Sequence, residues 1–302
     1  MLRNSAESAK THRPALRGRH WAVSTNHWLA SLAASRILDK GGNAIDAGVA
    51  AGLCLGVLQP DIVGSTGVAP IIVYLAETDE VITLSGLGRW PRAASPEFFM
   101  EQHGGDLPLG VLRCVTPAAI DAWCQALERW GTMSFGAVAE AAHDLAAGGF
   151  AMHRLLAETI AEDEDLYRTW DSSAAIMLPG GRLPQVGDPF VQADLGRTFA
   201  RLIAAEAGAS GGRKAGIRAV RDEFHEGAIA GDIMAHFQEQ GGLMTAGDLA
   251  EFRSQVEPPA RIAFGDWEVF TCGAWNQGPM MLEMIKLYEQ VAGSFSEIGS
   301  CD

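Results

Sequence analysis

Residue types that transfer protons are spread thinly along the 302-residue sequence. His27 lies near the expected start of a helix, and His143 and His153 lie in stretches with a helical pattern. A histidine side chain can exchange a proton near neutral pH, and a catalytic role would depend on that property. A lone histidine in such a position is more often structural or exposed, so we predict that none of the three is catalytic.

Metal ligation and disulfide chemistry have equally little support. The sequence has an odd number of cysteines and no CxxC pair, which favours buried reduced thiols over a zinc site or disulfide framework; they are Cys54, Cys114, Cys124, Cys272 and Cys301. The acidic run at 162–165 has no second ligand cluster and is typical of a solvated surface. We therefore expect neither a metal nor an organic cofactor.

The elements that must position any site are clearest between residues 20 and 60. Residues 20–25 have the composition of a short strand, and Thr25 or Asn26 would cap a helix through Leu38. Gly41 and Gly42 follow that helix, where its C-terminus requires left-handed backbone angles. The run after them predicts a second helix over 43–59, which is apolar on every side and therefore buried between layers.

Strands and further helices complete an α+β pattern. Residues 70–77 and 81–86 are rich in β-branched and aromatic types around a short polar turn, which predicts a hairpin in a buried sheet. A long helical section follows, and then two strand-like stretches around a turn at Gly265 and Asp266. This order favours an α+β sandwich over a regular βαβ array.

Charge and hydropathy exclude several partners. The formal net charge of −14 argues against nucleic acid, because binding a phosphate backbone needs clustered lysine and arginine. Asp46 interrupts the longest apolar run, which leaves no stretch long enough for a membrane span. The basic N-terminal residues 1–17 lack the apolar segment of a signal peptide, and we predict that they form a flexible arm. We therefore expect a cytoplasmic protein.

Several runs in succession carry a family resemblance. ILDKGGNAIDAGVAAGLCLGVLQP, VYLAETDEVITLSG, FHEGAIAGDIMAHFQEQGGLMTAGDLAEF and WEVFTCGAWNQGPMMLEMIKL closely resemble the large-subunit half of γ-glutamyltransferases and their amidohydrolase relatives. The resemblance covers roughly residues 18–300 and implies one large-subunit domain over 18–302. It also implies an N-terminal-nucleophile hydrolase fold, a four-layer αββα sandwich that is incomplete without the small subunit.

The resemblance implies a self-cleaving precursor whose small subunit begins with a nucleophilic threonine. The hydroxyl of that residue attacks the amide carbonyl, and its own α-amino group accepts the proton. The family places this threonine beyond the NQGP-type loop, and the present sequence has no match for it before its last residue, Asp302. Thr245 corresponds to an ordinary helix cap of the family. We therefore predict no catalytic residue in this chain, and we favour a fragment of a longer protein over a processing end at Asp302.

Two further motifs depart from the transferase pattern. Where transferases have a glycine-rich run, this sequence has VGSTGVAP. Gly64 and Gly67 remain, but Ala69 and Pro70 allow fewer backbone conformations than glycine does. Transferases hold the substrate α-carboxylate with an arginine in an RExAP-like stretch, where SGLGRWPRAAS stands here. By this resemblance, Arg89 is the predicted anion-binding residue and Arg92 the alternative.

The leading hypothesis is a large-subunit portion that is inactive alone. The complete enzyme would cleave a γ-glutamyl compound such as glutathione, or a related small amide, and transfer the acyl group to water or an amine. Sheet edges left uncovered by the absent small subunit would favour aggregation or a homo-oligomer. The alternative is a family derivative without catalysis that binds a small acid or acts as a scaffold.

Overall fold

The computed structural model describes residues 16–292, so almost all of the predicted N-terminal arm and Cys301 lie outside the described residues. Its longer elements follow the predicted order of two helices, a hairpin, a helical section and a second hairpin. The helices are α1 (Trp28–Asp39), α2 (Ala44–Leu58), α3 (Pro96–His103), α4 (Ala119–Trp130), α5 (Phe135–Gly148), α6 (Arg154–Glu162), α7 (Glu164–Arg168), α8 (Asp171–Met177), α9 (Ala193–Gly208), α10 (Arg213–His225), α11 (Ala228–Glu239), α12 (Ala246–Ala250) and α13 (Gly278–Ala292), with 3₁₀ turns η2 (Val111–Arg113) and η3 (Pro179–Gly181). The strands are β1 (Ile71–Leu75), β2 (Glu80–Leu84), β3 (Phe150–Ala151), β4 (Pro189–Phe190), β5 (Val256–Glu257), β6 (Ala260–Phe264) and β7 (Trp267–Thr271).

The strand predicted over 20–25 is wrong. A strand needs a backbone partner on at least one side, and none of the sheets formed by residues 16–292 includes this segment. The helix after it begins one residue later than the predicted caps allow, because the ring of His27 accepts a hydrogen bond from the amide of Leu29 and makes His27 the N-cap.

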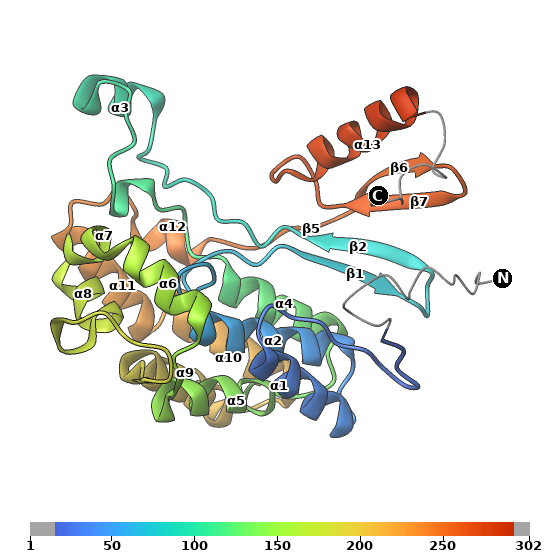
Figure 1. The fold of residues 1–302 in the computed structure, drawn as a ribbon, viewed down its shortest axis with the longest axis horizontal. Coiled ribbons are helices and arrows are strands. Elements are labelled where there is room, and N and C mark those ends of the chain that lie inside the picture. Colours follow the sequence, from blue (N-terminus) through green and yellow to red (C-terminus); the bar gives the residue numbers. More distant parts are fainter. Residues whose placement is uncertain (1–15, 293–302) are drawn as a thin grey trace.

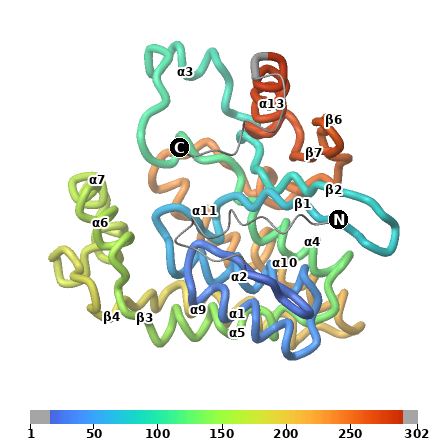
Figure 2. The backbone as a smooth tube through the Cα atoms, turned by 45° about the vertical axis from the view of Figure 1, so that its right-hand side comes forward, coloured from blue at the N-terminus to red at the C-terminus, as the bar shows by residue number. Residues whose placement is uncertain are grey.

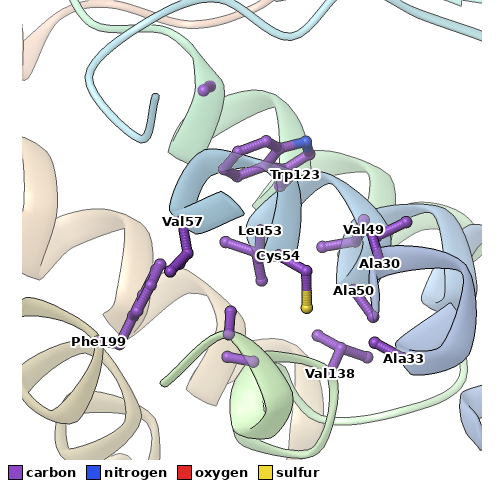
Figure 3. Packing of buried hydrophobic residues seen from close by; sticks show 14 of the residues in the cluster. Ala30, Ala33, Val49, Ala50, Leu53, Cys54, Val57, Trp123, Val138 and Phe199 are labelled. Carbon is purple, nitrogen blue, oxygen red and sulfur yellow. The ribbon is translucent and has the colours of Figure 1, made fainter. Parts of the chain in front are cut away.

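Helix α2 lies at the centre of the helical body, as its composition predicted. Gly41, with φ of 91°, takes the left-handed conformation in the turn between α1 and α2. Gly52 lets α2 approach α4, since a Cβ atom there would lie 3.0 Å from the indole nitrogen of Trp123. Figure 3 shows the side chains of α2 surrounded by apolar groups, among them Ala33 and Val138.

Asp46 fixes the start of α2 against the end of α4. The side chain of Asn43 caps α2, and Asp46 accepts a hydrogen bond from the Asn43 amide at 2.9 Å, which completes a capping box. Asp46, fully buried, also accepts from the amide and hydroxyl of Thr132, at 2.9 Å and 2.6 Å, and from the amide of Met133. Asn43 thus acts as the helix cap, and Asp46 as an internal hydrogen-bonding group.

A buried ion pair joins α4 to α10. The guanidinium Nε of Arg221 donates to a carboxylate oxygen of Asp121 at 3.1 Å. The other oxygen of Asp121 accepts from the amide of Ser254 at 2.7 Å, and Arg221 also donates to the carbonyl of Phe252. These contacts fix the segment that leads into β5.

Two small sheets lie above this helical body in Figure 1. Strand β2 pairs antiparallel with β1 and with β5, and Thr83 is opposite Glu257. Strands β6 and β7 form a second hairpin, on which α13 packs. The layers therefore run helix, sheet, sheet, helix, in agreement with the predicted α+β class, while α3 and its flanking loops stand away from the body (Figure 2).

Candidate anion-binding site

The segment that leaves β2 is fixed by its backbone. The amide of Ser85 donates to the carbonyl of Gln255, and the amide of Ala69 donates to the carbonyl of Gly86, each at 2.8 Å. Gly86 has φ of 47°, and a Cβ atom there would lie 1.9 Å from the Ala69 carbonyl oxygen. Only glycine fits such a close backbone approach in the left-handed region.

Arg89 lies at the end of this segment with its main chain held and its side chain open. The amide and the hydroxyl of Thr116 both donate to the Arg89 carbonyl, at 2.8 Å and 3.0 Å. Gly88 permits this approach, because a Cβ atom there would lie 1.9 Å from the Thr116 carbonyl oxygen. The Arg89 side chain is exposed and makes no hydrogen bond or ion pair within residues 16–292. A guanidinium so placed can take a carboxylate in a two-bond contact.

Arg92, the alternative candidate, is already engaged. Its guanidinium forms an ion pair with Glu251, and its amide donates to Asp248 at 3.2 Å. The hydrogen bond and charge of Glu251 raise the pKa of Arg92, and those of Arg92 lower the pKa of Glu251. A ligand carboxylate would have to displace Glu251, so Arg89 is the more available of the two arginines.

The glycine loop at 64–67 holds the start of α4, close in sequence to Thr116. The Gly67 carbonyl accepts hydrogen bonds from the amides of Ala118 and Ala119, at 2.9 Å and 3.1 Å, where α4 begins without a side-chain cap. Within the loop, a Cβ atom at Gly67 would lie 3.1 Å from the Gly64 carbonyl oxygen, so Gly67 lets the loop fold back on its own backbone. By holding the start of α4, the loop also holds Thr116 and, through it, Arg89.

The remaining candidates have structural partners. Thr245 caps α12 as predicted, because its hydroxyl accepts from the amide of Asp248 at 3.2 Å; it also donates to the Asp248 carboxylate at 2.8 Å. The Nδ1 atom of His143 lies 3.2 Å from a carboxylate oxygen of Asp144 on α5, whereas His27 and His153 each cap a helix. Burial raises the pKa of Cys54 to about 12, which makes it an unreactive thiol.

The facing surfaces of the two sheets enclose a second notable feature, an open apolar groove of about 820 Å³. It is lined by Ile72, Tyr74, Val81, Phe264, Trp267, Glu268, Val269 and Phe270. Trp267 is 71% exposed and Tyr74 61% exposed. Exposed aromatic groups on two facing sheets are typical of a surface that another polypeptide covers.

The part of the chain that the structure describes offers no group of three or more His, Cys, Asp or Glu side chains that could hold a metal ion. Within residues 16–292, no helix is both long and apolar enough to cross a membrane.

Sequence reasoning missed two contacts that shape this region. Thr116 lies 27 positions from Arg89 in the chain, and no local motif links them. The indole of Trp275 donates to a carboxylate oxygen of Glu257 at 2.7 Å and fixes the loop before α13. The only available signals were Gly86 and Gly88, since closely spaced glycines indicate backbone contact.

Two sheets layered between helices define an α+β protein. The chain belongs to the gamma-glutamyltranspeptidase family, because a model of that family matches residues 30–301.

Individual relatives agree with this assignment. The glutathione hydrolase proenzyme of Bacillus subtilis (strain 168) is 29% identical over 279 residues, which cover 90% of this chain and 45% of the relative. The acylase ACY 1 proenzyme of Pseudomonas sp. (strain SE83) is 31% identical, over 83% of this chain and 44% of its own length. The chain thus spans about half the length of these curated relatives.

A solved structure extends the likeness to the fold. The crystal structure of Helicobacter pylori gamma-glutamyltranspeptidase superposes with a TM-score of 0.83 over 95% of this chain and 80% of that one, at 23% identity. The predicted fold class is therefore confirmed.

Proposed function

We propose that this chain is the large-subunit portion of an enzyme that cleaves a γ-glutamyl compound or a related small amide. The observation that carries the proposal is Arg89, an exposed guanidinium on a main chain fixed by Thr116, in a member of the gamma-glutamyltranspeptidase family. Arg89 would hold a carboxylate of the substrate. Glutathione has such a group beside its γ-glutamyl amide, and relatives named as a glutathione hydrolase and an acylase support an amide as the bond that is cleaved.

The nucleophile in this proposal is the N-terminal threonine of a small subunit. Its hydroxyl attacks the amide carbonyl, its α-amino group takes the proton, and the acyl-enzyme passes to water or an amine. The apolar groove between the sheets supports a second polypeptide, because Trp267 and Tyr74 are too exposed there for a surface that stays uncovered.

Replacing Arg89 with alanine tests the site. In the complete two-subunit protein, Arg89→Ala is expected to raise KM for γ-glutamyl p-nitroanilide roughly tenfold to hundredfold, because a hydrogen-bonded ion pair to the substrate carboxylate is lost. The matched control is Arg92→Ala, whose guanidinium already binds Glu251. Steady-state kinetics give KM for both variants. An equal rise in KM for Arg89→Ala and Arg92→Ala would contradict the assignment of the carboxylate-binding role to Arg89.

The isolated 302-residue chain is expected to release no p-nitroaniline from the same substrate, since the nucleophile belongs to the partner. Measurable turnover by the purified chain would contradict this.

Mass spectrometry of the protein from its native source, with N-terminal sequencing, should also reveal a second chain that begins with threonine. A single chain that binds glutamate through Arg89 without turnover would favour the small-acid binding protein.

A further inference from the structure

Two histidines that the proposed chemistry does not use lie against each other at the end of α2. The ring centroids of His27 and His153 are 4.8 Å apart. They come from segments 126 positions apart in the sequence, at the starts of α1 and α6. His27 is buried and His153 is half-buried.

Each ring needs an unprotonated Nδ1 atom. The amide of Leu29 donates to Nδ1 of His27 at 3.2 Å, and the amide of Leu156 donates to Nδ1 of His153 at 3.3 Å. An imidazolium ring carries a proton on both nitrogens and cannot accept such a bond. The Nε2 atom of His153 lies 2.8 Å from the carbonyl of Leu58, so its proton is donated to the last residue of α2. The two neutral rings thus join the starts of α1 and α6 to the end of α2.

Within residues 16–292, the pKa of His27 is shifted by burial and by His153, and no carboxylate counters a positive charge on this ring. Neither α1 nor α6 has an acidic residue in its first turn. Arg154, next to His153, forms its ion pair with Glu158. Asp61 lies just beyond α2, and its negative charge is felt by Tyr167: burial and the Asp61 carboxylate both raise the pKa of the Tyr167 hydroxyl. From β3, the ring of Phe150 stacks on His153 at 6.3 Å.

We propose that His27 and His153 form an acid-sensitive latch, which holds α1 and α6 at the end of α2 while the rings are neutral and loosens when His27 gains a proton. Protonation of His27 removes the cap of α1 and places a positive charge beside the positive end of that helix. Burial and the neighbouring His153 lower the pKa of His27, in the direction that this arrangement requires. The folded state therefore binds fewer protons than the unfolded state just below pH 6.5, and the latch weakens as the pH falls through that range.

The latch leads directly to the glycine loop. Gln59, which follows α2, accepts a hydrogen bond from the side-chain amide of Asn26, the residue before His27. The chain then runs to Gly64 and Gly67, whose carbonyls hold the loop and the start of α4. Acid would thus loosen the support of the Arg89 region from a distance.

Hydrogen exchange of the 302-residue chain between pH 7.5 and pH 5.0 tests the latch. After correction for the intrinsic rates, exchange in residues 26–32 is expected to rise roughly tenfold at the lower pH, because the cap of α1 is lost. The variant His27→Asn/His153→Asn keeps capping side chains that do not titrate, and its exchange in this segment should stay nearly constant. His143→Asn is the matched control, since His143 lies inside α5, and it should behave as the unchanged protein does.

Equal pH dependence in the unchanged protein and the double variant would overturn the proposal, as would pH-independent exchange in both. If the double variant fails to fold, NMR titration of the unchanged protein decides instead. The expected result is a His27 signal that titrates below the ordinary histidine value of about 6.5 and loses the Nδ1-accepting tautomer as it does so. Titration of His27 at or above that value would overturn the proposal.

Discussion

Replacing Asp46 with alanine is expected to lower the free energy of unfolding by about 3–5 kcal/mol, a large share of the total for a single domain. The variant removes the buried carboxylate that accepts from the amides of Asn43 and Met133 and from both donors of Thr132. Hydrogen bonds to a charged group contribute about 1.5–3 kcal/mol each, and the partly exposed donors regain some of this from water. Chemical denaturation of the purified chain measures the change.

The matched control for this prediction is Asp39→Ala at the exposed end of α1, which should change stability by no more than about 0.5 kcal/mol. A loss for Asp46→Ala no larger than that of the control would contradict the role given to Asp46.

The same carboxylate makes stability depend on pH in acid. Burial alone would raise the pKa of Asp46, but the hydrogen bonds from Thr132, Asn43 and Met133 outweigh it and lower the pKa. The folded state therefore releases this proton more readily than the unfolded state. The stabilisation is complete above the ordinary carboxyl range near pH 4 and is lost as the pH falls through the lowered value.

The second large effect is expected at the ion pair between α4 and α10. Arg221→Met should lower the free energy of unfolding by about 3–5 kcal/mol, because it leaves the charge of Asp121 buried without its partner. Arg197→Met is the matched control, since Arg197 lies on the exposed face of α9.

A double variant separates the lost charge pair from lost packing. Asp121→Asn/Arg221→Met removes both charges, and we expect it to be more stable than Arg221→Met alone. The same denaturation experiment measures Asp121→Asn, Arg221→Met and the double variant. A double variant whose loss of stability equals the sum of the two single losses would show that the charges do not interact.

Local patterns predicted what depends on a few neighbouring residues. The capping box of α2 follows from an Asn and an Asp three positions apart, and its burial follows from an uncharged sequence. The hairpin of β1 and β2 follows from β-branched runs around a turn. Each of these features is decided within about twenty residues of chain.

Contacts between distant segments could not be predicted in this way. The hydroxyl of Thr132 donates to Asp46 from 86 positions away, and no local sequence pattern around either residue predicts this contact. The strand expected over 20–25 failed for the same reason, since its composition suits a strand but no strand within residues 16–292 pairs with it. At the candidate site, the sequence identified Arg89 by resemblance alone. Its main chain is fixed by Thr116, and Arg92 is engaged by Glu251; tertiary structure brings both partners into place.

The pairing of Thr83 with Glu257 also determines when the sheet can be completed during synthesis on the ribosome. Strand β2 is synthesised early, yet one of its edges has no strand beside it until more than 170 further residues have been made. At translation speeds of about 5–20 residues per second, that interval is roughly ten to thirty seconds. During it the nascent chain presents an unpaired edge beside exposed aromatic groups, the kind of surface that chaperones bind. Helices α1 and α2, which are neighbours in the chain, can pack against each other long before the sheet is closed.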